Sequence, residues 1–483
     1  MERILRATAT VGLSSLLTVV LGALRYKFVA VELGAAGVGL LGILTSAAAF
    51  GVILFGLGLN TSGVQATAAA ADDGVQLHRT RVALLLGSRW LGGVGGLLVA
   101  LLGMTLGASI LPKPVQPALM IWLGVALAAM VVSGGQLALL NGIGRIGALA
   151  KSNVWGSAIG TAVTIAAVYF SGQAGLISAL AAAPLATLAC SSWYLFREPK
   201  LYPPPRFSEW WPELRGMFAL GGVVMLGLLL GSATQLIIRV WLQRSQGLPQ
   251  AGYFQAAWTI TSLYLGFVLA ALAVEFFPRI SAQSEDPQRL NASVDRQVRI
   301  ALLLGTPVLL WMMVLSPFVL HVLYAADFQS ATGILRWQLF GDIFKIVGWA
   351  VAFLLLARKA RGAFFAAELT WNIGYLLLAL PLASQWGLSG LGMAYSGSYA
   401  LYLLVTLWLA RRETRFLLQR HTFALLAGLL LVGGITLWSV ENGSNLGLYA
   451  AVVLASGATV ASFFTLRRWL AGERRSANEV GLV

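Results

Sequence analysis

Apolar runs of about 20 residues follow one another through this chain of 483 residues, separated by short segments that hold most of its charges. A run of that length, coiled as a helix, spans the hydrocarbon core of a bilayer. Because 58% of the residues are hydrophobic and only 11% are charged, the composition excludes a soluble globular domain. The sequence therefore predicts an all-α membrane protein that crosses the bilayer many times.

We predict about fourteen transmembrane helices from the apolar runs. Their ranges are 5–31, 36–59, 80–111, 117–141, 150–170, 174–196, 214–242, 251–277, 296–323, 331–357, 361–384, 388–410, 421–440 and 446–468. The first run follows MERILR and resembles a secretory signal. Because it is long enough to span and further spans follow, we interpret it as an uncleaved first helix.

The basic residues predict the orientation, because cytoplasmic loops are rich in Lys and Arg. With a cytoplasmic N-terminus, 25 of the 33 basic residues fall in cytoplasmic loops, in tails or at the cytoplasmic ends of spans, two fall in outer loops and six fall deeper within spans. We therefore expect an inner-membrane protein with both termini in the cytoplasm. The net charge of +15 does not indicate nucleic acid as a partner, since the charges form short clusters between apolar runs.

Sequence motifs for cofactors, metals and catalysis are absent. The chain has one cysteine, Cys190, inside an apolar run, and its three histidines are widely spaced, so we expect no metal site. Neither a GxxxxGK[ST] phosphate loop nor an HExxH motif is present. The outer loops hold only a few residues each, which is too short for a membrane-embedded ligase or polymerase. We expect no cofactor and no enzymatic activity.

Short segments recur at an offset of a little over two hundred residues. RVALLLG at Arg81 returns as RIALLLG at Arg299, and GLISAL at Gly175 resembles GLSGLG at Gly387. We interpret this recurrence as a parallel repeat of two pseudo-symmetric six-helix lobes, an architecture in which substrate binds where the repeats meet. The alternative is chance similarity between segments rich in Leu and Gly. The repeat predicts an N-lobe (1–197), a proline-containing cytoplasmic linker (198–213), a C-lobe (214–411) and a C-terminal part with two further helices (412–483).

Apart from the basic residues that cluster at the cytoplasmic ends of the spans, nine charged residues lie within the predicted spans. A charge at the centre of a span costs roughly 2.5 to 3.5 kcal/mol, so each is a candidate functional residue. The acids are Glu275, Asp342 and Glu368, and the bases are Arg25, Lys27, Arg89, Arg239, Arg336 and Lys345. The excess of basic residues favours an anionic substrate over a cation.

Several of these charges have a simpler interpretation. Long side chains near the ends of a span reach the headgroups, which is the alternative for Arg25, Lys27, Arg239 and Arg336. For Glu275, close to the cytoplasmic end of its span, we expect an interface role.

Asp342 and Lys345 fall near the middle of span 331–357, in WQLFGDIFKIVGW. Their spacing places them on one helix face, together with Gln338. Either the two charges line a cavity, or they form a buried ion pair that only fixes packing. In span 361–384, Trp371 and Asn372 share a face with Glu368, and aromatic rings beside polar groups suit sugars.

Two segments carry a family resemblance. ELGAAGVGLLG (32–42) resembles the LGxxGxG motif of polysaccharide-export flippases of the multidrug/oligosaccharidyl-lipid/polysaccharide superfamily. WQLFGDIFK (337–345) is similar to the WQLxGDxxK segment of Wzx-type flippases, in particular the enterobacterial common antigen (lipid III) and O-antigen translocase branch. The resemblance implies a V-shaped pair of six-helix lobes that carries an undecaprenyl-diphosphate-linked oligosaccharide to the periplasmic leaflet by alternating access. It implies the lipid-linked glycan, membrane lipids and the polysaccharide polymerase and chain-length machinery as partners.

The expected sites follow from these charges and the resemblance. The candidates for binding diphosphate and glycan are Lys345, Asp342, Lys27, Arg25, Arg89, Arg239, Arg336, Gln338, Trp371 and Asn372. The candidates for ion coupling are Asp342, Glu368 and Glu275. Two other functions stay open: a lipid II flippase, which has fourteen helices, and a cation or drug antiporter, which needs an acid-rich lumen.

Overall fold

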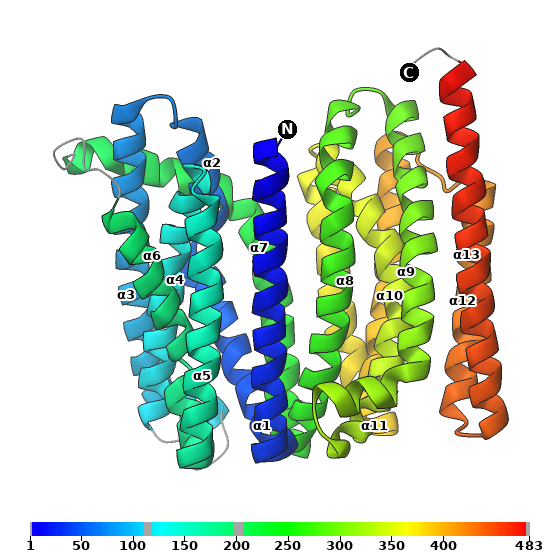
Figure 1. Cartoon of the computed structure of the whole chain (residues 1–483), viewed down its shortest axis with the longest axis horizontal. Helices are drawn as coiled ribbons and strands as arrows, with labels where there is room; N and C mark the ends of the chain where they lie inside the picture. Colours follow the sequence, from blue (N-terminus) through cyan, green and yellow to red (C-terminus); the bar gives the residue numbers. More distant parts are fainter. Residues whose placement is uncertain (1, 111–116, 198–205, 480–483) are drawn as a thin grey trace. The chain divides into compact units, whose positions relative to one another are not determined.

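The computed structural model describes residues 2–110, 117–197 and 206–479, and these residues are almost entirely helical (Figure 1). The apolar runs make helices because a backbone without water must satisfy its hydrogen bonds within its own segment. The elements are α1 (Glu2–Gly56), α2 (Leu59–Ala69), α3 (Gly74–Ile110), α4 (Pro117–Gly142), α5 (Ile146–Ala179), α6 (Ala182–Phe196), α7 (Phe207–Gln246), α8 (Leu248–Ala282), α9 (Pro287–Leu323), the 3-10 helix η1 (Ala326–Ala331), α10 (Thr332–Ala357), α11 (Arg361–Thr414), α12 (Arg420–Glu441) and α13 (Asn445–Glu479).

Three long helices are broken by a residue with non-helical backbone angles. The breaks lie at Gly34 in α1, Gly172 in α5 and Trp386–Gly387 in α11. Each glycine has a positive φ, a conformation that side chains disfavour. The three breaks fall in the gaps between consecutive predicted spans. Ten helices among the described residues are long and apolar enough to cross a membrane, and the number of fourteen crossings stays a prediction.

Positive backbone φ angles recur along the chain at the offset of the predicted repeat. Gly172 and Gly387, 215 positions apart, have φ/ψ of 56/−131° and 57/−136°. Gly144 and Lys359, also 215 apart, have φ of 74° and 57°, and each lies in a short connection between two helices. The recurrence favours the repeat over chance similarity. The lobe boundaries stay a prediction.

The predicted linker, 198–213, is helical in its second half. Residues 198–205, with the run of three prolines, lie outside the described residues. α7 already begins at Phe207 and includes Pro212. The helix continues through Pro212, which lies in its second turn and removes one intrahelical hydrogen bond.

The chain divides into two compact units, Met1–Gln255 with Leu323–Ala325 and Ala256–Val322 with Ala326–Val483. In the first unit, α1 packs against α5 and α7, and α3 against α4. Gly96 of α3 faces Gly124 of α4, where an added side chain would meet the backbone of the other helix. Small residues at these positions let the two helices approach closely.

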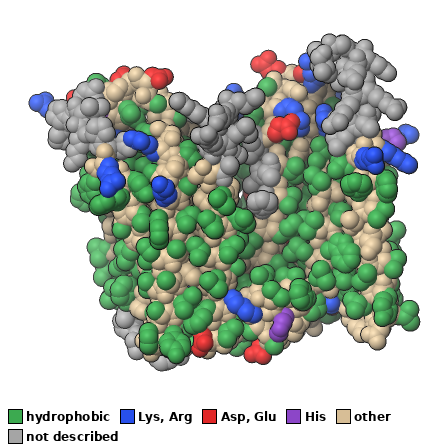
Figure 2. Space-filling model, viewed as in Figure 1, with side chains coloured by type: hydrophobic (Ala, Val, Ile, Leu, Met, Phe, Trp, Pro, Cys, Tyr) green, Lys and Arg blue, Asp and Glu red, His purple; other side chains and the backbone are tan. Residues whose placement is uncertain are grey.

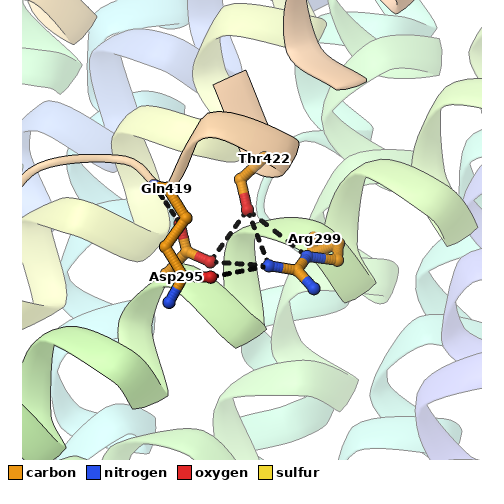
Figure 3. A network of polar contacts seen from close by, with 4 residues as sticks. All are labelled: Asp295, Arg299, Gln419 and Thr422. Atoms are coloured by element: carbon orange, nitrogen blue, oxygen red, sulfur yellow. Dashed lines mark hydrogen bonds and ion pairs between the residues drawn. The ribbon is translucent and has the colours of Figure 1, made fainter. Parts of the chain in front are cut away.

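In the second unit, α10 packs against α11, and α12 is held at both ends. At its N-terminal end, Asp295 of α9 accepts hydrogen bonds from Arg299 (3.0 Å), Thr422 (2.8 Å) and the backbone N–H of Gln419 (2.9 Å), as Figure 3 shows. At the other end, Arg336 of α10 lies 3.5 Å from a carboxylate oxygen of Glu441. These contacts join α12 to the helices of the predicted C-lobe.

Hydrophobic side chains cover the middle of the helices, and the Lys and Arg side chains in view gather mostly toward one end (Figure 2). Many of the exposed side chains are large and apolar, among them Leu98, Leu404 and Leu431. Exposed apolar surface of this extent suits contact with lipid tails and not with water. Together with the long apolar helices it shows a multi-pass membrane protein.

Replacing Asp295 with Ala will destabilise the protein by about 3 kcal/mol, because it removes the carboxylate that pairs with Arg299 and accepts hydrogen bonds from Thr422 and Gln419. Glu275→Ala is the matched control. It removes an ion pair whose carboxylate is 82% exposed, and such pairs contribute between about 0 and 1 kcal/mol. Thermal unfolding in detergent measures both variants. Equal melting temperatures for the two would contradict the structural role of Asp295.

Candidate functional site

A cavity of about 630 Å³, lined by both polar and apolar side chains, lies within the first unit. It is lined by residues of α1, α2, α4, α5 and α6. Arg25 is the charged residue among them, and most of the others carry hydroxyl or amide groups: Ser14, Ser15, Thr18, Asn60, Ser133, Asn153, Ser157 and Thr187. The described residues that line it include neither Asp nor Glu. The cavity therefore offers one cation and many neutral hydrogen-bonding groups.

Arg25 has unused hydrogen-bonding capacity in this cavity. Its Nε is buried and finds no hydrogen-bond partner among the described residues. A guanidinium presents its N–H groups in a planar fork that matches phosphate oxygens. Hydroxyl and amide groups donate and accept, as sugar hydroxyls require. The arrangement is suited to a phosphorylated sugar or sugar lipid.

Arg239, also in the first unit, lies in a separate network. Its side chain is 2% exposed, and it donates hydrogen bonds to the side chains of Gln255 (2.7 Å) and Gln235 (2.8 Å). Gln255 in turn donates to the Tyr26 hydroxyl (3.3 Å), so this network reaches the part of α1 that carries Lys27. The alternative that the Arg239 side chain reaches the lipid headgroups is wrong, because its guanidinium is buried and hydrogen-bonded inside the unit.

In the second unit, Tyr395 lies between the two charges of the WQLFGDIFK segment. The Tyr395 hydroxyl donates to Asp342 Oδ1 (2.7 Å), and Lys345 Nζ donates to the same hydroxyl (3.2 Å). The Lys345 ammonium also lies 5.2 Å from the ring centroid of Tyr399. The Tyr395 hydroxyl of α11 therefore connects Asp342 and Lys345 by two hydrogen bonds. The sequence predicted instead that the two charges line a cavity or form a direct ion pair.

Two buried groups beside this triad have unused polar atoms. Asp342 is fully buried, and its Oδ2 has no hydrogen-bond partner among the described residues. The same holds for both amide atoms of Gln338, one turn earlier on α10. A buried polar atom without a partner costs free energy, so a water molecule or an ion bound at these atoms would be stabilised.

The face of α11 predicted from its spacing lies next to the triad. The Trp371 ring packs against Tyr375 and Tyr399, with centroids 6.0 and 5.2 Å away. Glu368 accepts a hydrogen bond from the Tyr402 hydroxyl (3.3 Å), and its backbone carbonyl accepts one from Asn372 (2.8 Å). α11 thus brings a second carboxylate close to the Asp342–Tyr395–Lys345 triad.

The remaining predicted residues lie elsewhere. Arg89 is exposed and lines a different cavity, which shares no residue with the Arg25 cavity. Arg336 donates to the Ser316 hydroxyl (3.0 Å) and pairs with Glu441, so its contacts are those of a structural residue and not of headgroup snorkelling. Glu275 forms an exposed ion pair with Arg279 (3.0 Å), which fits the interface role.

Three tyrosines in the second half of α11 were not predicted as site residues. Tyr395, Tyr399 and Tyr402 recur at the i, i+4, i+7 spacing of one helix face, and that pattern was available as a signal. The three are buried and surround Lys345 and the two carboxylates. The polar lining of the Arg25 cavity had no such signal, because its residues come from five separate helices.

Replacing Tyr395 with Phe will remove the hydroxyl and keep the ring. Without the hydroxyl, the hydrogen-bonded bridge between Asp342 and Lys345 is lost, so the two charges must pair directly or bind water. We expect transport to fall by about tenfold, the effect of one hydrogen bond to a charged group, with the melting temperature little changed. Tyr449→Phe, on an exposed tyrosine of α13, serves as the control. Unchanged transport in Tyr395→Phe would contradict a role for the bridge.

Comparison of the sequence with known proteins identifies a family and two relatives. A profile of the family described as "Polysaccharide biosynthesis protein" matches residues 4–283. The "Lipid III flippase" proteins of Escherichia coli (strain K12) and Shigella flexneri are each 23% identical over 405 residues, covering 82% of this chain and 95% of the relative.

Solved structures share the fold. An inward-facing multidrug resistance transporter of the MATE family in the MOP superfamily superposes with a TM-score of 0.70 at 16% identity, covering 83% of this chain and 95% of its own. The lipid II flippase MurJ gives 0.68 at 14% identity, covering 95% and 99%. The matched profile covers more than half of the sequence, and the chain belongs to the polysaccharide biosynthesis protein family.

Proposed function

We propose that this protein is a flippase that moves a polyprenyl-diphosphate-linked oligosaccharide from the cytoplasmic to the periplasmic leaflet, for the assembly of a cell-surface polysaccharide. The observation that carries the proposal is the Arg25 cavity, which joins a guanidinium to hydroxyl and amide groups without a carboxylate among its described lining residues. The names of the curated relatives support the same substrate class.

In the proposed mechanism, Arg25 binds the diphosphate and the hydroxyl and amide groups around it bind the glycan. The polyprenyl tail stays in the apolar core of the bilayer, so it does not have to enter water during the transfer. The further candidates for binding the diphosphate were Lys27, Arg89, Arg239 and Arg336. The contacts of Arg239 and Arg336 favour structural roles for these two residues. The membrane potential adds about 2.3 kcal/mol per charge per 100 mV, which favours outward movement of an anion when the inside is negative.

The triad of the second unit has the groups that coupling to an ion gradient needs. Asp342 has an unused oxygen and lies next to Gln338, while Glu368 is held by Tyr402. Protonation or sodium binding at Asp342 would release Lys345 from Tyr395 and change how α10 and α11 hold together. In this proposal Lys345 is a coupling residue, and Trp371 and Asn372 keep the helix face around it rigid.

The proposed arrangement in the membrane follows the basic residues. Fourteen crossings, in two six-helix lobes and two further helices, place both termini in the cytoplasm. The lobes alternate in exposing the substrate site to the two sides. A polysaccharide polymerase and the chain-length machinery are the proposed partners that receive the translocated glycan.

A lipid II flippase is the second candidate. It is favoured by the coverage of the MurJ fold, which extends over 95% of this chain and so beyond twelve helices. A cation or drug antiporter is not supported by the Arg25 cavity, since a cation needs carboxylates there. All three share the fold, so the substrate decides among them.

Reconstituted transport discriminates between the candidates. The purified protein in liposomes is given either a polyprenyl-diphosphate oligosaccharide or lipid II, each with a fluorescent head. The fraction protected from a membrane-impermeant quencher is followed over time. Movement of the oligosaccharide lipid alone supports the proposal, movement of lipid II alone supports the second candidate, and movement of neither contradicts both.

A further inference from the structure

A second cavity, of about 490 Å³, lies in the first unit between α3, α4 and α6. Its polar lining consists of His78, Arg81 and Arg89 of α3, Gln136 of α4 and Ser192 of α6. The rest is apolar and includes Leu85 and Phe196. As in the Arg25 cavity, the described lining residues include no carboxylate. The cavity therefore combines two permanent positive charges with an aliphatic and aromatic wall.

The polar wall of this cavity is fixed by its own hydrogen bonds. Arg81 donates to the backbone carbonyl of Leu195 (3.1 Å), which uses one of its five N–H groups. Gln136 is 3% exposed and donates to the Ser192 hydroxyl (3.0 Å). A cavity held in this way is formed before a ligand arrives, so binding does not have to order it.

The position of Arg89 requires an explanation. It lies fifteen residues into α3, inside an apolar span, yet its side chain is exposed. Its neighbour Trp90 is 70% exposed, and Phe196 at the cavity wall is 73% exposed. A cation on a lipid-facing surface is costly unless it reaches headgroups or an anion. Arg89 and Arg81 line the same cavity.

We propose that this cavity binds the phosphate of an anionic phospholipid, with one acyl chain along its apolar wall. Arg81 and Arg89, which line the same cavity, hold the phosphate. Basic pockets between transmembrane helices are suited to anionic headgroups. A lipid fits better than a soluble phosphate, because the surface around the cavity is apolar. The inference does not depend on the substrate of the Arg25 cavity.

Lipid retention by the full-length protein tests the proposal. The protein is purified in detergent, mixed with phosphatidylglycerol or phosphatidylcholine, and examined by native mass spectrometry. We expect Arg89→Gln to weaken phosphatidylglycerol retention about fivefold, the effect of one arginine near a headgroup. Arg89→Lys keeps the charge and should retain most of the affinity. Arg412→Gln is the control, because Arg412 is an exposed arginine that stacks on Trp408 (3.8 Å from the ring centroid), outside the cavity.

Three results would overturn the proposal. Equal losses in Arg89→Gln and Arg412→Gln would show general surface electrostatics instead of a site. Equal retention of phosphatidylcholine and phosphatidylglycerol by the unmodified protein would show that the cavity does not distinguish an anionic headgroup from a zwitterionic one. Arg89-dependent binding of a polyprenyl phosphate in preference to phosphatidylglycerol would assign the cavity to a substrate lipid. Because Arg89 is exposed, its variants should fold, and size-exclusion chromatography verifies this.

Discussion

Replacing Arg25 with Ala will reduce translocation of the lipid-linked oligosaccharide by at least about 30-fold. Truncating one partner of a buried, hydrogen-bonded charge pair costs about 2 to 5 kcal/mol, and each 1.4 kcal/mol is a factor of ten. Arg25 is the charged residue that lines its cavity in the first unit, and its Nε has no internal partner to lose. The loss should therefore fall on transport and spare stability.

Arg25→Lys provides the graded comparison. A lysine keeps the charge and loses the planar fork, so we expect an intermediate rate. Arg412→Ala, at an exposed arginine outside the cavity, should transport at the unmodified rate. The assay is the liposome transport described above, with protein amount and melting temperature measured for each variant. Unimpaired transport by Arg25→Ala would contradict the assignment of the diphosphate to this cavity.

Replacing Lys345 with Ala will abolish export and leave the folded protein in the membrane. Lys345 is tied to Asp342 through Tyr395, and its removal leaves a fully buried carboxyl group without a cation. Removing one partner of a buried pair costs about 3 to 5 kcal/mol when the other stays charged. Protonation of Asp342 relieves much of this cost, which is why we expect the fold to survive.

The double variant Lys345→Ala with Asp342→Asn separates coupling from packing. It removes both charges, so the part of any stability loss that comes from an unpaired buried carboxylate should be recovered, while the space left by the lysine side chain remains. If the triad couples transport to an ion gradient, export stays absent in the double variant. Recovery of export together with stability would show that the two charges serve only packing. Complementation of a host that lacks the protein measures export, and membrane fractions measure protein amount.

The helical fold could be predicted from the sequence because bilayer length and hydropathy constrain each span locally. The breaks at Gly34, Gly172 and Gly387 fall between predicted spans, since glycine there permits a positive φ. The start of α7 within the predicted linker was missed, because Pro203–Pro205 suggested an irregular segment and one later proline does not end a helix.

The site could be predicted only in part. Spacing on one helix placed Asp342, Lys345 and Gln338 on a common face, but the residue that joins the charges lies 50 positions later on α11. Arg336 illustrates the same limit, since its partner Glu441 lies on α12 and could not be inferred from the position of either residue. Partners distant in sequence are set by packing, which spacing alone does not encode.

The most direct test of the central claim is to deplete the protein in its host and determine on which face of the inner membrane the lipid-linked glycan accumulates. Oriented vesicles and a membrane-impermeant probe that labels the glycan give the answer. The proposal predicts accumulation on the cytoplasmic face, with little of the glycan reaching the periplasmic face. An unchanged distribution between the two faces would contradict the assignment of this protein as the flippase.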